Sequence, residues 1–157
     1  MEIRMVTERK KDYLPLLLMA DEEEAMIDRY LSRGVMYVLD DQGIKTVCVV
    51  TEEGNGVLEL KNLATVPACR RRGYARRMID FLVQTYRGRY TTLRVGTGDS
   101  PLTLPFYEKC GFRRVGVIPD FFTKNYSHPI FECGKQLVDM IYLARELSVP
   151  ADTESGL

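Results

Sequence analysis

The chain has 157 residues, 45% of them hydrophobic, and its 22 basic side chains balance 22 acidic ones. A chain of this length buries enough apolar surface to form a core without metal ions or disulfide bonds. Zero formal charge argues against the basic surface of a protein that coats nucleic acid, and the hydrophobic content excludes a disordered chain. We therefore expect one folded domain that binds no nucleic acid.

The cysteines, the single histidine and the N-terminal region limit the other classes of site. The four cysteines are far apart in the sequence: Cys48, Cys69, Cys110 and Cys133. With His128 as the only histidine, they lack the spacing of a zinc site, so we expect no metal. The longest apolar run, from Leu14 to Ala20, is too short to cross a bilayer. The sequence thus predicts a cytoplasmic protein with reduced thiols and no membrane partner.

The N-terminal part predicts a strand followed by two helices. Residues 1–6 alternate as a strand does, and Asp12 is placed to cap a short helix. Asp21 and Glu24 form a capping-box pattern for a second helix, which Gly34 ends. Two helices are therefore expected before the next strand.

Three β-branched runs separated by turn residues predict antiparallel strands: Val35–Leu39, Ile44–Thr51 and Val57–Val66. In the third run the apolar positions change phase between Leu60 and Leu63. A strand with a period of two needs an extra residue for this change, so we expect a β-bulge at Lys61 or Asn62. Because bulges often lie beside functional sites, this strand is a candidate for one.

The second half of the chain mixes helices and strands. Apolar residues at i, i+4 and i+8 predict a helix after Pro67 that runs to Tyr86, and Leu104–Cys110 predicts a shorter one. Strands are expected at Thr91–Val95, Phe112–Val117 and Leu137–Leu143. The aromatic connection from Gly116 to Gln136 is either a lid over a pocket or a satellite hydrophobic cluster. We expect one α/β domain over residues 1–147 and a flexible tail at 148–157.

A cluster of arginines stands at the start of the predicted helix after Pro67. Arg70, Arg71 and Arg72 add positive charge where a helix dipole is already positive, so an anion is needed to compensate. Gly73 lets the backbone approach a ligand, and Ala75 leaves room beside it. Neither a P-loop nor a GxGxxG motif is present. We expect a pyrophosphate site; the alternatives are a solvated basic face or a contact to acidic lipid or RNA.

Two motifs resemble signatures of the GNAT superfamily of acetyl-CoA-dependent N-acetyltransferases. Arg70 to Ala75 match its Q/R-x-x-G-x-G/A loop, and Phe106 to Phe112, FYEKCGF, match its Y-E-K-x-G-F segment. Both occur in the order and separation that the family shows. The resemblance implies an α/β (α+β) fold with a mixed, mainly antiparallel central sheet, helices on both faces and a splayed cofactor cleft.

The resemblance also implies how acetyl-CoA binds as co-substrate. Backbone groups of Ala64, Thr65 and Val66 would pair with the pantetheine arm, and Asp99 and Ser100 would touch it from the far side. Thr91–Val95 would be the parallel strand that diverges to open the cleft. The pyrophosphate would be held by the arginine loop and helix start, that is by Arg70, Arg71, Arg72, Gly73, Tyr74, Ala75 and Arg76. Asp99 departs from the asparagine of many relatives, and an ionised carboxylate only accepts hydrogen bonds.

Acetyl transfer to an amine needs a proton donor, a base and a group that polarises the thioester. The resemblance implies that Tyr107 protonates the leaving sulfur; its alternative role is that of a core aromatic residue. It places Glu59 as the general base, unless this residue is a solvent-facing strand carboxylate and a water chain deprotonates the amine. The amide of Thr65 or Val66 would polarise the carbonyl.

Three further candidates have competing explanations. His128 is a substrate contact, a second base or an ordinary loop residue. The acidic run Asp21–Glu24 either attracts a cationic amine or complements a helix dipole. Cys110 is expected to pack rather than to form a covalent intermediate, because no histidine lies near it in the sequence.

We therefore expect an N-acetyltransferase that moves acetyl from acetyl-CoA directly to a primary amine. A small molecule is the expected acceptor. The last strands, residues 112–143, are a candidate surface for a homodimer, which the sequence does not require. The alternatives are a protein N-acetyltransferase and a non-catalytic module that senses CoA.

Overall fold

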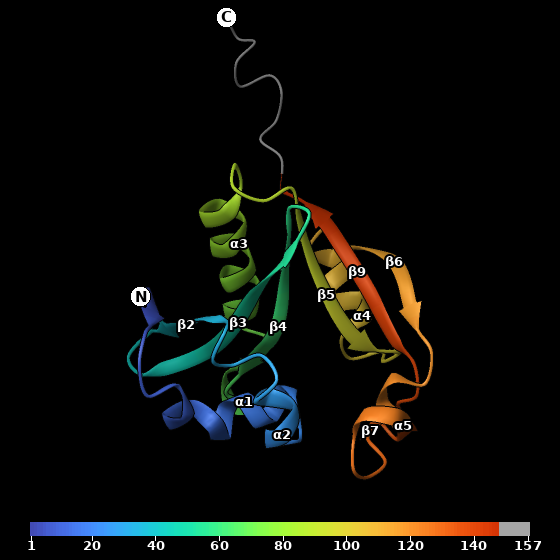
Figure 1. The fold of residues 1–157 in the computed structure, drawn as a ribbon. Coiled ribbons are helices and arrows are strands. Elements are labelled where there is room, and N and C mark those ends of the chain that lie inside the picture. The colour runs from blue at the N-terminus through green and yellow to red at the C-terminus, as the bar shows by residue number, and fades with distance from the viewer. Residues whose placement is uncertain (148–157) are drawn as a thin grey trace, which may run out of the picture.

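A mixed seven-stranded sheet forms the centre of the computed structural model, which describes residues 1–147 (Figure 1). The strand order is β1-β2-β3-β4-β5-β9-β6, and every neighbouring pair is antiparallel except β4–β5. The strands are β1 Glu2–Val6, β2 Val35–Asp40, β3 Ile44–Gly54, β4 Val57–Thr65, β5 Thr92–Gly98, β6 Arg113–Ile118 and β9 Met140–Glu146. The tail expected at 148–157 lies outside the described residues.

Helices and a small hairpin complete the described chain. The α-helices are α1 Leu14–Ala20, α2 Glu24–Ile27, α3 Tyr74–Tyr86, α4 Leu104–Lys109 and α5 Phe121–Asn125, and 3-10 turns lie at Lys10–Tyr13 and Pro67–Cys69. The hairpin pairs β7 Phe131–Glu132 with β8 Lys135–Gln136, apart from the main sheet. Together with α5, this hairpin occupies the connection between β6 and β9, residues 119–139, which we call the β6–β9 segment.

Each face of the sheet buries its own hydrophobic core. On one face, Met78 and Leu82 of α3 pack against strand residues that include Leu60. On the other face, Leu17 of α1 and Ile27 of α2 pack against residues of β2, β3 and β4. A mixed, mainly antiparallel sheet with helices on both faces confirms the fold class expected from the sequence.

The expected β-bulge is present at Lys61. In the β3–β4 ladder Val49 pairs with Asn62 and Val50 pairs with Leu60, so Lys61 has no partner across the ladder. Because of this extra residue, Leu60 and Leu63 both contact the α3 core although they are three positions apart. The bulge thereby turns Asn62 towards the opposite face of the sheet, where α1 lies.

The expectations for the N-terminal helices are wrong in detail. Asp21 caps no helix N-terminus; it lies at the C-terminal end of α1, and its buried side chain bonds to tyrosines. Helix α2 is a single turn with Glu23 before it, and the chain continues in turns as far as Gly34. Asp12 lies in a 3-10 turn, where it pairs with Arg9 instead of capping α1.

The last strand also begins later than the sequence suggests. Strand β9 starts at Met140 rather than at Leu137, because Leu137 packs with Phe122 and Ile130 in a separate cluster.

Within residues 1–147, no helix combines the length and the apolar character needed to cross a bilayer.

Candidate active site

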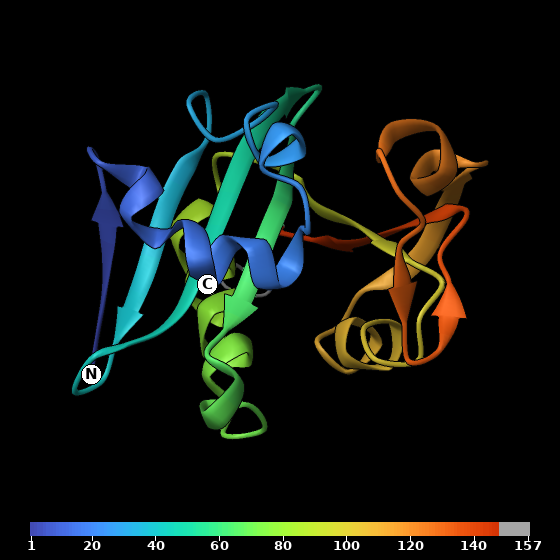
Figure 2. The same ribbon diagram turned by 90° about the horizontal axis from the view of Figure 1, so that it is seen from below.

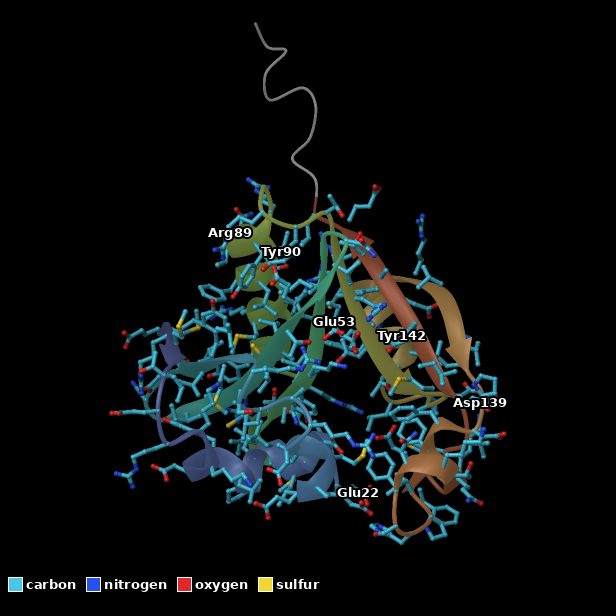
Figure 3. The ribbon with its side chains drawn as sticks, in the orientation of Figure 1. Glu22, Glu53, Arg89, Tyr90, Asp139 and Tyr142 are labelled. Atoms are coloured by element: carbon cyan, nitrogen blue, oxygen red, sulfur yellow. The ribbon has the colours of Figure 1, made fainter. Side chains whose placement is uncertain are left out.

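A large cleft separates the two halves of the sheet. Figure 1 shows β4 and β5 adjacent at one end and diverging towards the other, and Figure 2 shows the same separation from below. The cleft has a volume of about 870 Å³ and is lined by β4, β5, α4, the loop before α3, the α1–α2 region and the β6–β9 segment. Among its lining residues, Tyr142 lies on β9, and Glu22 lies just before the start of α2 (Figure 3).

The cleft exists because the parallel pair β4–β5 is short. It runs from the pair Val57–Thr92 to the pair Leu60–Val95 and ends at the bulge. Beyond this point β4 keeps only β3 as a neighbour, and β5 keeps only β9. The two facing edges therefore present backbone N–H and C=O groups with which an extended ligand can pair.

A row of free amides lies at the start of α3. None of the backbone N–H groups from Arg71 to Arg76 donates a hydrogen bond to residues 1–147, and the first helical bond runs from Arg77 N to Gly73 O at 3.0 Å. The loop has positive φ angles of 66° at Arg71 and 84° at Gly73. Glycine adopts this conformation without the steric cost of a Cβ atom. Together with the helix dipole, these donors suit a pyrophosphate.

Arginine side chains add positive charge around these amides. Arg70, Arg71 and Arg72 are exposed, and within residues 1–147 none of them forms an ion pair. Arg76 is positioned by the carbonyl of Lys109, to which it donates at 3.3 Å. The charge at this helix start is therefore left for an anion to neutralise.

Tyr107 of α4 belongs both to the core and to the cleft lining. Tyr107 is 8% exposed, and its ring lies edge-on to the rings of Phe106 and Phe112. The hydroxyl has no hydrogen-bond partner within residues 1–147, while the residue lines the cleft. Burial raises the pKa of this phenol well above its usual range. The hydroxyl therefore stays protonated at neutral pH and is able to donate to a leaving group.

Glu59 of β4 is 3% exposed, so it is not the solvent-facing carboxylate of one sequence interpretation. Arg94 of β5 donates through Nε to its Oε1 at 2.8 Å, and Lys61 Nζ lies 3.0 Å from its Oε2. The Arg94 guanidinium also lies over the Tyr142 ring, 4.5 Å from the centroid. Glu59 thus lines the cleft, but both of its oxygens are paired with cations, and the pair with Arg94 joins β4 to β5.

A hydrogen-bond network spans the other end of the cleft. Tyr126 donates to Asp21 Oδ1 at 2.7 Å, and Tyr30 donates to Asp21 Oδ2 at 3.0 Å. Asn62, next to the bulge, donates to the Tyr30 hydroxyl and to the Leu17 carbonyl, both at 3.0 Å. Burial raises the pKa of Asp21, while hydrogen bonds from the two tyrosines oppose this. The network connects β4 to the β6–β9 segment.

Further contacts tie the α1–α2 region to the β6–β9 segment. Ser127 N donates to Glu23 at 2.7 Å, and the His128 ring lies 3.1 Å from the same carboxylate. Arg29 donates to the Asn125 side chain at 3.1 Å. We call these contacts, together with Tyr126–Asp21, the bridge between residues 21–29 and 125–128. Hydrogen bonds from Ser127 lower the pKa of Glu23 below its usual value.

Comparison with known protein families shows to which family the chain belongs. The family model described as an acetyltransferase (GNAT) domain matches residues 32–114, more than half of the chain. The chain belongs to the GNAT family of acetyltransferases. It is 30% identical over 150 residues to the uncharacterized N-acetyltransferase YvbK of Bacillus subtilis, with 94% of this chain and 97% of the relative covered.

Solved structures of GNAT proteins have the same fold. A GNAT family acetyltransferase from Elizabethkingia anophelis with acetyl-CoA bound is similar with a TM-score of 0.87 and 30% identity, over 92% of this chain and 97% of that one. An IAA acetyltransferase from Bacillus cereus is similar with a TM-score of 0.84 and 34% identity, over 92% and 99% of the two chains. The chain is therefore a GNAT acetyltransferase, as its motifs imply.

The GNAT cleft brings together most of the residues expected to bind acetyl-CoA. Those that line it are Ala64, Thr65, Arg70, Arg71, Gly73, Tyr74, Ala75 and Arg76. Val66, Arg72, Asp99 and Ser100 are not among the lining residues. The Val66 amide donates to the Lys45 carbonyl at 2.9 Å, so it is not free to polarise a thioester.

The two residues expected on the far side of the pantetheine have other partners. Asp99 pairs with Lys135 at 3.1 Å, on the exposed side of the β7–β8 hairpin. Ser100 is buried, and its hydroxyl accepts a hydrogen bond from the Leu102 amide at 3.0 Å. The adjacent residues 101–103 line the cleft instead.

The remaining candidates are resolved by burial and packing. Cys110 is 4% exposed within the α3 core, and burial raises the pKa of its thiol, so it packs as expected. In the β6–β9 segment, Phe122, Ile130 and Leu137 form a small hydrophobic cluster, and all three also line the cleft. Both interpretations of the aromatic connection, a cluster and a cover over the pocket, therefore apply to the same residues.

Sequence reasoning missed the polar network at the end of the cleft beside α1 and α2. Tyr30, Asn62 and Tyr126 meet around Asp21, yet the sequence separates Asp21 from Tyr126 by 105 positions. Glu132 of β7 also lines the cleft and carries no motif. The one available signal was the bulge, which marked the strand that holds Asn62.

Proposed function

We propose that this GNAT enzyme transfers acetyl from acetyl-CoA to the primary amine of a small molecule by direct attack. The observation that supports it best is the single cleft that joins three features. It contains the free amides before α3, the unpartnered hydroxyl of Tyr107 and an acceptor region crossed by the bridge. These features match the three parts of the reaction, namely donor binding, protonation of the thiol and acceptor binding.

Acetyl-CoA fits the donor end of the cleft on chemical grounds. Amides of residues 71–76 and the exposed side chains of Arg70 and Arg71 suit the pyrophosphate. The free edge of β4 at Ala64 and Thr65 suits the amide groups of the pantetheine arm. A relative with 30% identity carries acetyl-CoA, which favours the same donor here.

Direct transfer needs no covalent intermediate on the enzyme. The raised pKa of Cys110 keeps its thiol protonated, which makes it a poor nucleophile. The Tyr107 hydroxyl has the donor capacity to protonate the departing sulfur. Acceptor and donor therefore need to bind in the cleft at the same time.

The bridge supports a small acceptor rather than a protein tail. An extended peptide needs an open groove along which its backbone can lie on both sides of the reacting amine. Here Tyr126–Asp21, Ser127–Glu23 and Arg29–Asn125 contacts cross the acceptor end from α1–α2 to the β6–β9 segment. A small amine is able to occupy the part of the cleft that Asp21, Arg29 and Tyr126 line.

Thiol release measures the proposed activity directly. The purified protein would be incubated with acetyl-CoA and a panel of aralkyl, alkyl and amino-acid amines, together with N-terminal and lysine peptides, and CoA thiol would be titrated. We expect turnover with at least one small amine and none with the peptides. Turnover with peptides alone would contradict the acceptor class, and CoA binding by calorimetry without any turnover would indicate a sensor.

A further inference from the structure

Four carboxylates line the cleft, and they differ in how they are held: Asp21, Glu22, Glu59 and Glu132. Glu59 is paired with Arg94 and Lys61, and Asp21 accepts hydrogen bonds from two tyrosines. Glu22 lies 3.8 Å from His128 at the edge of the bridge. Each of these three carboxylates thus already has a polar or cationic neighbour from this chain.

Glu132 differs from the other three. Within residues 1–147 it has neither a hydrogen-bond partner nor an ion-pair partner, although it is only partly exposed. Lys135 stands opposite Glu132 in the β7–β8 ladder, but its ammonium pairs with Asp99 at 3.1 Å. The negative charge of Glu132 is therefore left unneutralised inside the cleft, where a cation of the substrate gains most from it.

Glu132 lines the same cleft as Tyr107, the proposed proton donor. Its carboxylate is close enough to Tyr107 to contribute, after burial and two cysteines, to the raised pKa of that phenol. Glu132 and Tyr107 both line the same cleft, one from the β6–β9 segment and the other from α4. A carboxylate and a phenol hydroxyl, each without a partner within residues 1–147, are thus close enough across the cleft to interact electrostatically.

The segment that carries Glu132 also gives the cleft apolar walls. Side chains of this segment and of β9 line the cleft: Phe122, Tyr126, Ile130, Leu137, Met140 and Tyr142. Gly98 of β5 allows this packing, because a Cβ atom there would lie 2.6 Å from the Leu137 side chain. A ligand that meets both the free carboxylate and these walls carries an ammonium group on an apolar or aromatic body.

We propose that Glu132 binds the ammonium of the acceptor and takes its proton, and that the acceptor is a primary amine with an apolar or aromatic body. This role rests on the proposed function, because it concerns the acceptor of the same acetyl transfer. It also assigns the base to the β6–β9 segment instead of Glu59 on β4.

The proton and electron balance of the step is closed. Glu132 takes one proton from R–NH₃⁺, and the freed lone pair attacks the thioester carbon, so that a C–N bond forms and the C–S bond breaks. Tyr107 gives its proton to the sulfur and regains one from the acylated nitrogen. Glu132 then releases its proton to water, and the products are one amide, one thiol and one proton.

Glu132→Gln tests this role with little risk to folding, because the side chain makes no contact of its own that the amide would break. With 2-phenylethylamine and acetyl-CoA, we expect kcat/KM at pH 7 to fall about 100-fold. The loss should shrink as pH rises towards the pKa of the amine, since solvent then supplies the free base. Calorimetry should show unchanged affinity for acetyl-CoA. Asp120→Asn is the matched control, because it removes a carboxylate of the same segment outside the cleft lining, and asparagine tolerates the φ of 57° there.

A binding measurement decides the same question without turnover. The wild-type complex with CoA should bind 2-phenylethylamine at least about tenfold more tightly than the Glu132→Gln complex, a difference expected for loss of an ion pair in a cleft. Equal kcat/KM and pH profiles in wild type and variant, or equal or no amine binding, would overturn the role of Glu132. If wild type acetylates the amine and Glu132→Gln does so at the same rate, the role of Glu132 is overturned and the proposed function stands. Amine binding that depends on Glu132 without any acetylation would contradict the proposed function alone.

Discussion

The two ends of the cleft are built in different ways. The donor end relies on backbone donors from one short stretch, residues 71–76, whose conformation includes the positive φ of Gly73. The acceptor end relies on side chains from β4, the α1–α2 region and the β6–β9 segment. The donor end is therefore sensitive to local backbone conformation, whereas the acceptor end is sensitive to tertiary contacts between distant segments.

Gly73→Pro should break the donor end and has the largest expected effect. Proline fixes φ near −65°, which is incompatible with the 84° observed, so the amides would no longer converge. We expect acetyl-CoA affinity, measured by calorimetry, to fall at least about 100-fold, as for the loss of one or two charge-assisted hydrogen bonds. Gly88→Pro is the control, because Gly88 has a similar φ of 91° but lies outside the cleft. Equal affinity in the two variants would rule out the role of this loop.

Tyr107→Phe addresses the chemistry between the two ends. Removing the hydroxyl deletes the proton donor while the ring keeps its packing, so kcat should fall about 100-fold and the Kd of acetyl-CoA should not change. Stopped thiol-release assays and calorimetry would measure the two quantities. Tyr86→Phe removes a core hydroxyl that bonds to Tyr37 at 2.7 Å and lies outside the cleft lining, and it should leave kcat unchanged. A Tyr107→Phe enzyme with full kcat would remove this residue from the mechanism.

Glu59→Gln tests whether the paired carboxylate beside the β4–β5 ladder acts in chemistry or in structure. The change leaves Arg94 and Lys61 without their anion, and because both are only partly buried we expect unfolding free energy to fall by about 1–3 kcal/mol in urea titrations. The value of kcat should fall by less than about tenfold, well below the effect of a lost base. The exposed pair Glu108–Arg114 supplies the control, since Glu108→Gln should cost under about 1 kcal/mol. A larger loss of kcat than in Glu132→Gln would return the base role to Glu59.

Acidification should loosen the bridge, the smallest effect of the series. Hydrogen bonds from Ser127 lower the pKa of Glu23 from its usual 4.5, so this contact contributes above that pH and is lost as pH falls through the lowered value. Hydrogen-exchange protection of the Ser127 amide should therefore decrease below about pH 4.5 in wild type. Glu23→Ala, which removes both acceptor oxygens, should show low protection already at neutral pH, and identical protection in both proteins would contradict the contact.

Local patterns in the sequence predicted local structure well. The α3 helix ends at Tyr86 as its periodicity indicates, and the phase change between Leu60 and Leu63 located the bulge. The arginine loop and its glycine predicted a helix start open to an anion, because these features depend on neighbouring residues alone. The GNAT family then followed from two short motifs.

Features that depend on distant contacts were not predictable in this way. The pattern at Asp21 favours a helix cap, but two tyrosines, one of them 105 positions away, hold its carboxylate instead. Leu137 continues an apolar run, yet it packs with Phe122 and leaves the strand to begin at Met140. Glu59 fits a family position, whereas its pairing with Arg94 across two parallel strands decides what it is free to do.

The short β4–β5 pair and the bridge together give the cleft the form of a ring. The two halves of the molecule are joined at one end by the four residue pairs of the β4–β5 ladder and at the other by contacts between residues 21–29 and 125–128. The loop with the free amides leads into α3, which packs on one face of the sheet, and α1 and α2 pack on the opposite face. Under the proposed function, acetyl-CoA and the amine would occupy different parts of this ring, so that neither would have to leave before the other enters.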